Sequence, residues 1–291
     1  MDDRQLALSL VLVAMVFSVA LELRLQDFRR VLETPRAIVA GLIPQFLLLP
    51  VASWLATLVL DLPADIEAAM LLVAACPGGS LSNVVTHLGG GDTALSVSLS
   101  AVAGVAALVL TPFNFSWMVA TNPATADWLR ELAIAPSEIA FSLLVLLAAP
   151  MLAGIALAHR APAFAAHLRR PLARASLVAL FAFIVVGLYR DRALLDSSLL
   201  PLLAIVIAQN GAGLSLGDLC ARAFRLPSRA RRAIVIEAGM QNSGLALGII
   251  ALQFGGDLGM VVIASLWGIW HIVTGLGLAF LWRRHDVRHG L

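Results

Sequence analysis

The chain has 291 residues, of which 60% are hydrophobic and only 13% charged, and its mean hydropathy is +0.92. Soluble domains are roughly half apolar and about a quarter charged, so this composition excludes an ordinary soluble protein and indicates a membrane protein. The net charge of +2, carried by arginines that flank apolar segments and form no single basic face, argues against a nucleic-acid partner.

Apolar blocks recur along the chain, and each is close to the roughly 20 helical residues that cross a hydrocarbon core about 30 Å thick. Divided at charged or Pro/Gly-rich breaks, they predict nine spans: 5–23, 37–60, 67–88, 92–119, 137–158, 173–189, 198–220, 231–254 and 258–282. The longest loops, near 120–136 and 159–172, are too short to fold alone. We therefore expect an all-α membrane protein with a single transmembrane domain over residues 1–291.

The arginines predict the orientation of the chain, because cytoplasmic loops are enriched in basic residues. Sixteen of the twenty lie on the side of the C-terminus and of the loops after the first, third, fifth and seventh spans. We expect the N-terminus outside and the C-terminus in the cytoplasm, in the cell (inner) membrane with lipid around the spans.

Two spans are interrupted by residues that disfavour a continuous helix. The third contains Cys76–Asn83, with a proline, two glycines and three polar side chains, and the eighth contains Glu237–Gly244, with two glycines and a carboxylate. Unpaired backbone amides cost several kcal/mol in hydrocarbon, so we expect both breaks to be buried or to line a cavity. The alternative is that the breaks are simple kinks and that the polar side chains only join neighbouring helices.

The interrupted spans occupy corresponding positions if the third span is paired with the eighth. That pairing also matches the first with the sixth, the second with the seventh and the fourth with the ninth, in opposite orientations. The pattern predicts inverted repeats, about 5–119 and about 137–283, with two discontinuous crossing helices that form a transporter's binding site.

The polar residues at the breaks are the kinds of donor that a hard cation such as sodium takes. Glu237 supplies a charge that is costly at this depth and marks an ion or substrate path. Ser96 and Ser100 lie one helical turn apart on one face, although membrane serines also bond the carbonyl one turn back. Gln45, beside Pro44, is a similar polar intrusion. Half-helix N-termini after the glycines would favour an anionic substrate.

The segments Cys76–Asn83, Ala94–Leu99 and Glu237–Ala246 resemble the bile acid:sodium symporter family, and the resemblance extends from the first span to the ninth. It implies a core domain, a panel domain, two sodium ions bound in the core, and a substrate held between the domains under alternating access. The chain is similar to the nine-span type, without the extra N-terminal helix of ten-span members.

The resemblance also implies roles for individual residues. The positions of one sodium site match Ser82, Asn83, Ser96, Ser100 and Glu237. The positions of the other match Gln45, Glu237 and Gln241, with the backbone of Ala238 and Met240. Substrate contacts fall on Ser80, Asn242 and His271. Ile272 stands where some relatives carry Asn, and His271 could instead be a polar residue satisfied between helices.

The sequence thus predicts a sodium-coupled importer of small organic anions, with bile-acid-like sterols, pantoate-like hydroxy acids and keto acids open as substrates. A sodium-independent uniporter or exporter of the same fold is the first alternative. An intramembrane enzyme is a second and weaker one, because the spans offer only Glu237 and an isolated His271 and no catalytic set. No obligate protein partner is indicated.

Overall fold

The computed structural model describes residues 3–21, 32–79, 81–190 and 199–289, and every named element within them is helical. The elements of the first half are α1 (Asp3–Ala20), α3 (Pro35–Ile43), the π-helical turn η1 (Pro44–Leu48), α4 (Leu49–Leu60), α5 (Ala64–Ala75), α6 (Leu81–Leu88), α7 (Thr93–Thr121) and α8 (Pro123–Glu131). Those of the second half are α9 (Pro136–Arg160), α10 (Pro162–Arg190), α11 (Leu199–Ala223), α12 (Ser228–Gly239), α13 (Ser243–Gln253) and α14 (Leu258–His289).

Five of these helices are long and apolar enough to cross a membrane: Pro35–Leu60, Thr93–Thr121, Pro136–Arg160, Leu199–Ala223 and Leu258–His289. Helix α13 is apolar but shorter. The third and eighth predicted spans are divided, as expected, into α5 with α6 and α12 with α13. The chain is therefore a helical membrane protein with two broken segments.

Two segments predicted as loops are largely helical, which corrects the sequence analysis. Residues 120–136 contain α8, because Asn122 accepts a hydrogen bond from the Thr125 amide and Pro123 follows at the first helical position. Residues 159–172 contain the start of α10, which begins at Pro162. In both places a proline stands at the first helical position, where its missing amide hydrogen costs nothing.

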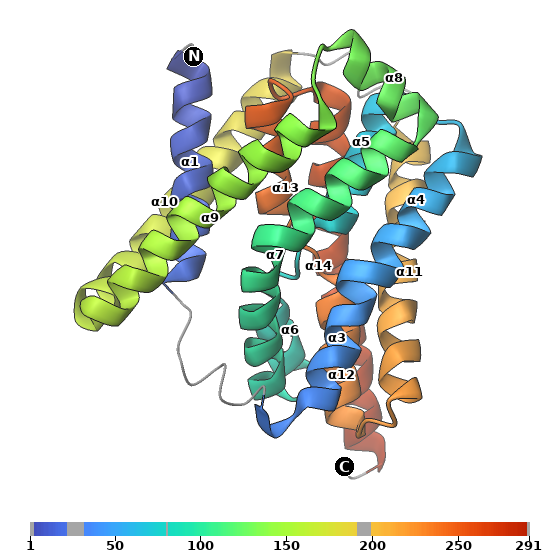
Figure 1. The fold of residues 1–291 in the computed structure, drawn as a ribbon. Coiled ribbons are helices and arrows are strands. Elements are labelled where there is room, and N and C mark those ends of the chain that lie inside the picture. The colour runs from blue at the N-terminus through green and yellow to red at the C-terminus, as the bar shows by residue number, and fades with distance from the viewer. Residues whose placement is uncertain (1–2, 22–31, 80, 191–198, 290–291) are drawn as a thin grey trace.

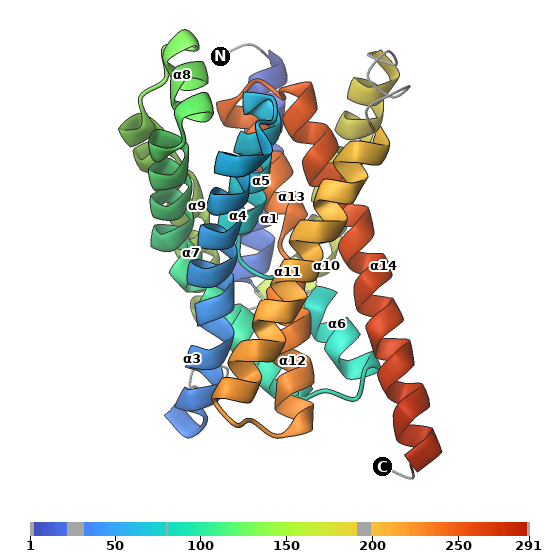
Figure 2. The same cartoon turned by 90° about the vertical axis from the view of Figure 1, so that its right-hand side faces the viewer.

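The helices form two groups that meet along one seam. Helices α1, α9 and α10 pack on one another, while α3 to α7 and α11 to α14 pack around the two breaks. The groups touch where α7 meets α9 and where α13 meets α1. In Figures 1 and 2, α5 and α13 occupy the upper half of the second group and α6 and α12 the lower half.

The largest buried apolar cluster lies around α5 and α13 and includes Trp267 of α14 and Phe115 of α7. A smaller cluster joins α6, α12 and α14 through Val85, Ile236 and Ala279. The breaks thus lie between two apolar layers, which hold the ends of four half-helices in place.

Candidate ion and solute site

The site is built on two short stretches of non-helical backbone, which we call the first break (Cys76–Gly79) and the second break (Met240–Asn242). Pro77 has no amide hydrogen, so α5 cannot continue through it with its normal hydrogen bonds. Helices resume at Leu81 and Ser243. The sequence prediction that the helix fails in both places is correct.

The two breaks satisfy each other's backbone groups. Gly78 and Gln241 form an antiparallel bridge. The Gly79 amide donates to the Met240 carbonyl at 3.1 Å, and the Asn242 amide donates to the Pro77 carbonyl at 2.8 Å. These bonds remove the cost of unpaired backbone groups inside the protein. The breaks therefore stabilise each other as a pair.

Gly78 is required by the close approach of the second half. A Cβ atom at this position would lie 2.5 Å from Oε1 of Glu237 and 3.2 Å from its carbonyl oxygen. At Gly79 the nearest atom to an added Cβ is Cα of Asn242 at 3.7 Å, an ordinary contact. Only the first of these two glycines makes space for the carboxylate.

The Glu237 side chain is fully buried in the last turns of α12 and is surrounded by serine hydroxyls. Its Oε2 accepts from Oγ of Ser82 at 2.6 Å and lies 3.4 Å from Oγ of Ser96. Its Oε1 accepts from Oγ of Ser100 at 2.7 Å. Within the described part of the chain no arginine or histidine forms an ion pair with this carboxylate.

Hydrogen-bond acceptors outnumber hydroxyl donors in this cluster. Ser82, Ser96 and Ser100 supply three hydroxyl hydrogens for four oxygens. These oxygens are the two of Glu237, Oδ1 of Asn83 at 2.7 Å from Ser96 and 3.2 Å from Ser100, and the Gly79 carbonyl at 2.7 Å from Ser82. Each hydroxyl donates only once. A cation among these oxygens would complete the bonding and balance the carboxylate, so the donor set fits sodium.

A second set of oxygens comes from η1 and the second break. Gln45 is held in the π-helical turn, where its Oε1 accepts from the Gly78 amide at 3.3 Å, and its Nε2 has no partner among the described residues. Oε1 of Gln241 is buried without a donor in the described part of the chain, while its Nε2 donates to the Ala238 carbonyl at 3.2 Å. An acceptor left unpaired inside a protein costs about 1–3 kcal/mol, which a cation would recover.

The structure brings the predicted ion ligands together at the breaks, with Gln45 contributed by η1. Ser82 and Asn83 lie in the first turn of α6, and Ala238 lies in the last turn of α12. Met240 follows the end of α12, and its carbonyl already accepts the Gly79 amide. A carbonyl oxygen has a second lone pair, so this bond leaves Met240 able to contact an ion.

The predicted substrate residues are placed less uniformly. Ser80 lies outside the described residues. Asn242 caps α13 by accepting from the Leu245 amide at 3.0 Å. His271 of α14 is 6% exposed. It lies on the same helix face as Gly268, which approaches Ser243, and Gly275, which approaches Met240. It therefore lies against the second break.

Asn210 is a residue of this site that the sequence analysis missed. Its Nδ2 donates to the Gly239 carbonyl at 2.7 Å, and its Oδ1 accepts from Oγ1 of Thr274 at 2.9 Å. It is completely buried and ties α11 and α14 to the end of α12. It lies in the seventh predicted span, which the sequence analysis pairs with the second, the span of Gln45; an amide side chain in that paired span is the signal that could have identified it.

The chain is similar to known proteins over nearly its whole length. Residues 9–197 match the model of the sodium bile acid symporter family. "Uncharacterized sodium-dependent transporter YocS" of Bacillus subtilis is 31% identical over 95% of this chain and 83% of its own length. "Probable sodium/metabolite cotransporter BASS1, chloroplastic" of Arabidopsis thaliana is 29% identical over 92% of this chain and 65% of its own. The human ileal sodium/bile acid cotransporter is 28% identical over 85% of this chain and 69% of its own length.

Proposed function

This chain belongs to the sodium bile acid symporter family, and on that premise we propose that it is a symporter that uses sodium to import a small organic anion. The observation that carries the proposal is the surplus of oxygen acceptors around the buried Glu237. A carboxylate with no cationic partner in the described structure is costly inside a membrane unless an ion balances it. Relatives named as sodium-dependent transporters and cotransporters support sodium as that ion.

We assign two sodium ions to this centre. One lies among Glu237, Asn83 and the serine hydroxyls. The other lies between Gln241, Gln45 and the carbonyls at the end of α12. The unpaired Oε1 of Gln241 supports the second position. Because Glu237 borders both sets, binding of one ion changes the charge that the other meets, so the two ions bind interdependently.

The substrate is a carboxylate held where α6 and α13 begin. Both half-helices start beside the breaks, and helix N-termini present free amides and a partial positive charge to anions. Bile-acid-like, pantoate-like and keto-acid substrates share the carboxylate that this position recognises. We assign contacts to Ser80, Asn242 and His271. Sodium orders the breaks and removes the charge of Glu237, so anion affinity rises once the ions are bound.

Alternating access follows from the two helix groups, with α1, α9 and α10 as the panel and the remaining spans as the core. The panel packs against α13 in the upper half, but no extensive contact joins α9 or α10 to α6 or α12 among the described residues. The lower ends of α9 and α10 point away from them in Figure 1. Leu81, Val84 and Leu88 of α6 are exposed. With the C-terminus in the cytoplasm, this is an inward-open state.

The remaining topology stays as the sequence predicts it: nine spans, inverted repeats, an outer N-terminus and an inner-membrane location. The alternatives are a sodium-independent uniporter or exporter of the same fold and an intramembrane enzyme. Transport that ignores a sodium gradient would favour the first. The family's members are transporters, which favours transport over enzymatic catalysis.

The test is uptake into proteoliposomes with an imposed sodium gradient, across a panel of carboxylates, for the parent protein and Glu237→Gln. We expect sodium-driven uptake to be lost in the variant, because the amide is uncharged and cannot balance the ions. Glu67→Gln is the matched control. Glu67 is equally buried, but its oxygens accept from the Leu62 amide and from Nδ2 of Asn122, away from the breaks. Undiminished sodium-driven uptake in Glu237→Gln would overturn the mechanism.

A further inference from the structure

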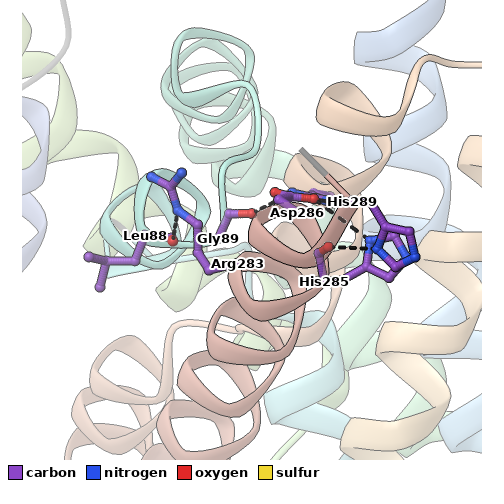
Figure 3. Close-up of polar contacts among 7 residues, drawn as sticks. Leu88, Gly89, Arg283, His285, Asp286 and His289 are labelled. Carbon is purple, nitrogen blue, oxygen red and sulfur yellow. Dashed lines mark hydrogen bonds and ion pairs between the residues drawn. The ribbon is translucent and has the colours of Figure 1, made fainter. Parts of the chain in front are cut away.

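An ion pair joins three helix ends on the side of the molecule where the C-terminus lies. Figure 3 labels its acid, Asp286 of α14, close to Leu88 and Gly89 at the end of α6. The base of the pair is Arg232 of α12. Both terminal guanidinium nitrogens of Arg232 donate to Asp286, Nη1 to Oδ2 and Nη2 to Oδ1, each at 2.6 Å. The two side chains are only 12% and 13% exposed. A bidentate ion pair that is largely shielded from solvent fixes the relative position of its two side chains far more tightly than an exposed pair does.

The same arginine also binds the end of α6. Nη1 of Arg232 donates to the Gly89 carbonyl at 3.0 Å, and Nε of Arg283 donates to the Leu88 carbonyl at 2.9 Å. The last carbonyls of a helix carry a partial negative charge, which favours these guanidinium groups. Trp282 adds a ring 5.5 Å from the guanidinium carbon of Arg232. We call Arg232, Asp286, Arg283 and the Leu88 and Gly89 carbonyls the latch.

The turn after α6 is shaped to receive this arginine. Gly90 has a φ of +68°, which a residue with a side chain rarely adopts, and a Cβ there would lie 3.1 Å from Nη1 of Arg232. A Cβ at Gly91 would meet Cγ2 of Thr86 at 2.7 Å and Cβ of Arg232 at 3.3 Å. The backbone therefore passes directly against the arginine.

The latch holds the far ends of the two half-helices that carry the ion ligands. Helix α6 runs from Ser82 at the site to Leu88 at the latch, and α12 runs from Arg232 at the latch to Glu237 at the site. At 1.5 Å per residue, each distance is only about one to two helical turns. A shift at the latch therefore moves the hydroxyl of Ser82 relative to the carboxylate that it bonds.

We infer that Arg232 and Asp286 are a positioning pair for sodium: they fix the spacing of α6 and α12 and thereby the geometry of the oxygens around Glu237. Neither side chain contacts the ion. This inference rests on the proposed function, because it requires Glu237 to be the centre of a sodium site. It predicts that loss of the pair weakens sodium binding beyond any effect on folding.

A neighbouring pair provides the control. Arg231, the adjacent residue of α12, contacts Asp218 of α11 at 2.7 Å, and the two side chains are 40% and 28% exposed. It lies on the same helix and the same side of the molecule, but it does not reach α6. Loss of this pair removes the same charges without releasing α6 from α12.

The experiment measures the sodium concentration that gives half of the maximal thermal stabilisation of the purified protein, with choline replacing sodium to keep ionic strength constant. The test set is Arg232→Gln, Asp286→Asn, their double variant and Arg232→Lys, with Arg231→Gln and Asp218→Asn as controls. We expect each test single to raise this concentration about tenfold, the scale of one lost charge-assisted hydrogen bond. The double variant should match either single, because the two residues act as one unit.

Arg232→Lys keeps the charge but not the bidentate geometry, so its sodium affinity should lie between those of the parent protein and Arg232→Gln. The control variants should change the half-stabilising sodium concentration less than about twofold, as expected for an exposed pair. The proposed function stands if sodium stabilises the parent protein but not Glu237→Gln. In that case, an unchanged half-stabilising sodium concentration in Arg232→Gln and Asp286→Asn would overturn this inference alone. A parent protein indifferent to sodium, or a responsive Glu237→Gln, would overturn the proposed function and this inference with it.

Discussion

The two breaks have the same backbone arrangement but very different side chains. Each donates one amide to the other across the bridge between Gly78 and Gln241. In each half the preceding membrane segment also contributes an amide side chain, Gln45 to the first break and Asn210 to the end of α12. The two halves are thus equivalent in their backbone hydrogen bonds and in the amide side chain that a neighbouring helix contributes.

The side chains that we assign to the ion do not follow this equivalence. The sequence offset that relates Gly78 to Gln241 places Ala74 opposite Glu237 and Leu245 opposite Ser82. One half therefore supplies hydroxyls and the other supplies the carboxylate. The proposed ion site is therefore complete only when the two breaks lie side by side as they do here. Ion binding then depends on the relative position of the two halves.

The largest expected effect comes from closing the space between the halves. In Gly78→Ala the new Cβ would meet both the carboxylate and the carbonyl of Glu237, so the bridge and the ion site are disturbed together. We expect a loss of about 1–3 kcal/mol in unfolding free energy, typical of overpacking, and no sodium-dependent shift in melting temperature. Differential scanning fluorimetry with and without sodium measures both.

Gly79→Ala is the matched control for that experiment, because its Cβ has room. It should retain the sodium-dependent shift. A Gly78→Ala protein that binds sodium as well as Gly79→Ala would show that the close approach of the halves is unimportant.

The next effect concerns the hydroxyls that only one half supplies. Ser100→Ala removes the donor to Oε1 of Glu237, and we expect the half-saturating sodium concentration for uptake to rise about tenfold, the scale of a hydrogen bond to a charged group. Ser98→Ala is the control on the same helix, since its hydroxyl donates only to the Ala94 carbonyl. Equal shifts in the two variants would contradict the assignment of Ser100 to the ion.

The sequence was sufficient to predict the breaks, and it led to a hypothesis about the type of site. Pro77 and the glycines of both segments cannot continue an ordinary helix in hydrocarbon, where each unpaired backbone group is expensive. A carboxylate at that depth requires a partner. These are local rules, and the resemblance to a known family assigned individual ligands among the polar residues nearby.

The sequence did not predict which individual residues contact one another across the fold. The bridge between the breaks and the bond from Arg232 to Asp286 connect residues far apart in the chain, and their partners depend on the packing of whole helices. Asn210 has an ordinary polar side chain whose role depends on the end of α12 lying beside it. Composition and periodicity do not contain such distances.

A smaller effect is expected from Gly239→Ala, at the end of α12 just before the second break. Its Cβ would overlap Cδ2 and Cγ of Leu214, and that side chain, unlike the backbone near Gly78, can rotate away. Alanine also favours the last turn of α12, which offsets part of the cost. We expect a loss of about 1 kcal/mol in unfolding free energy with sodium affinity retained. A loss of sodium binding as complete as that of Gly78→Ala would make the two breaks equally sensitive.

The smallest expected effect separates capping from substrate recognition at Asn242. The Asn242→Ala variant loses the cap on α13 and about 1 kcal/mol of unfolding free energy, measured by thermal denaturation, whereas Asn242→Asp keeps an oxygen for the Leu245 amide. The added charge should nevertheless repel an anion from the start of α13. We therefore expect Asn242→Asp to retain stability and sodium binding but to raise the substrate concentration for half-maximal uptake. If the substrate dependence is unchanged in Asn242→Asp, the residue caps the helix and does not face the substrate.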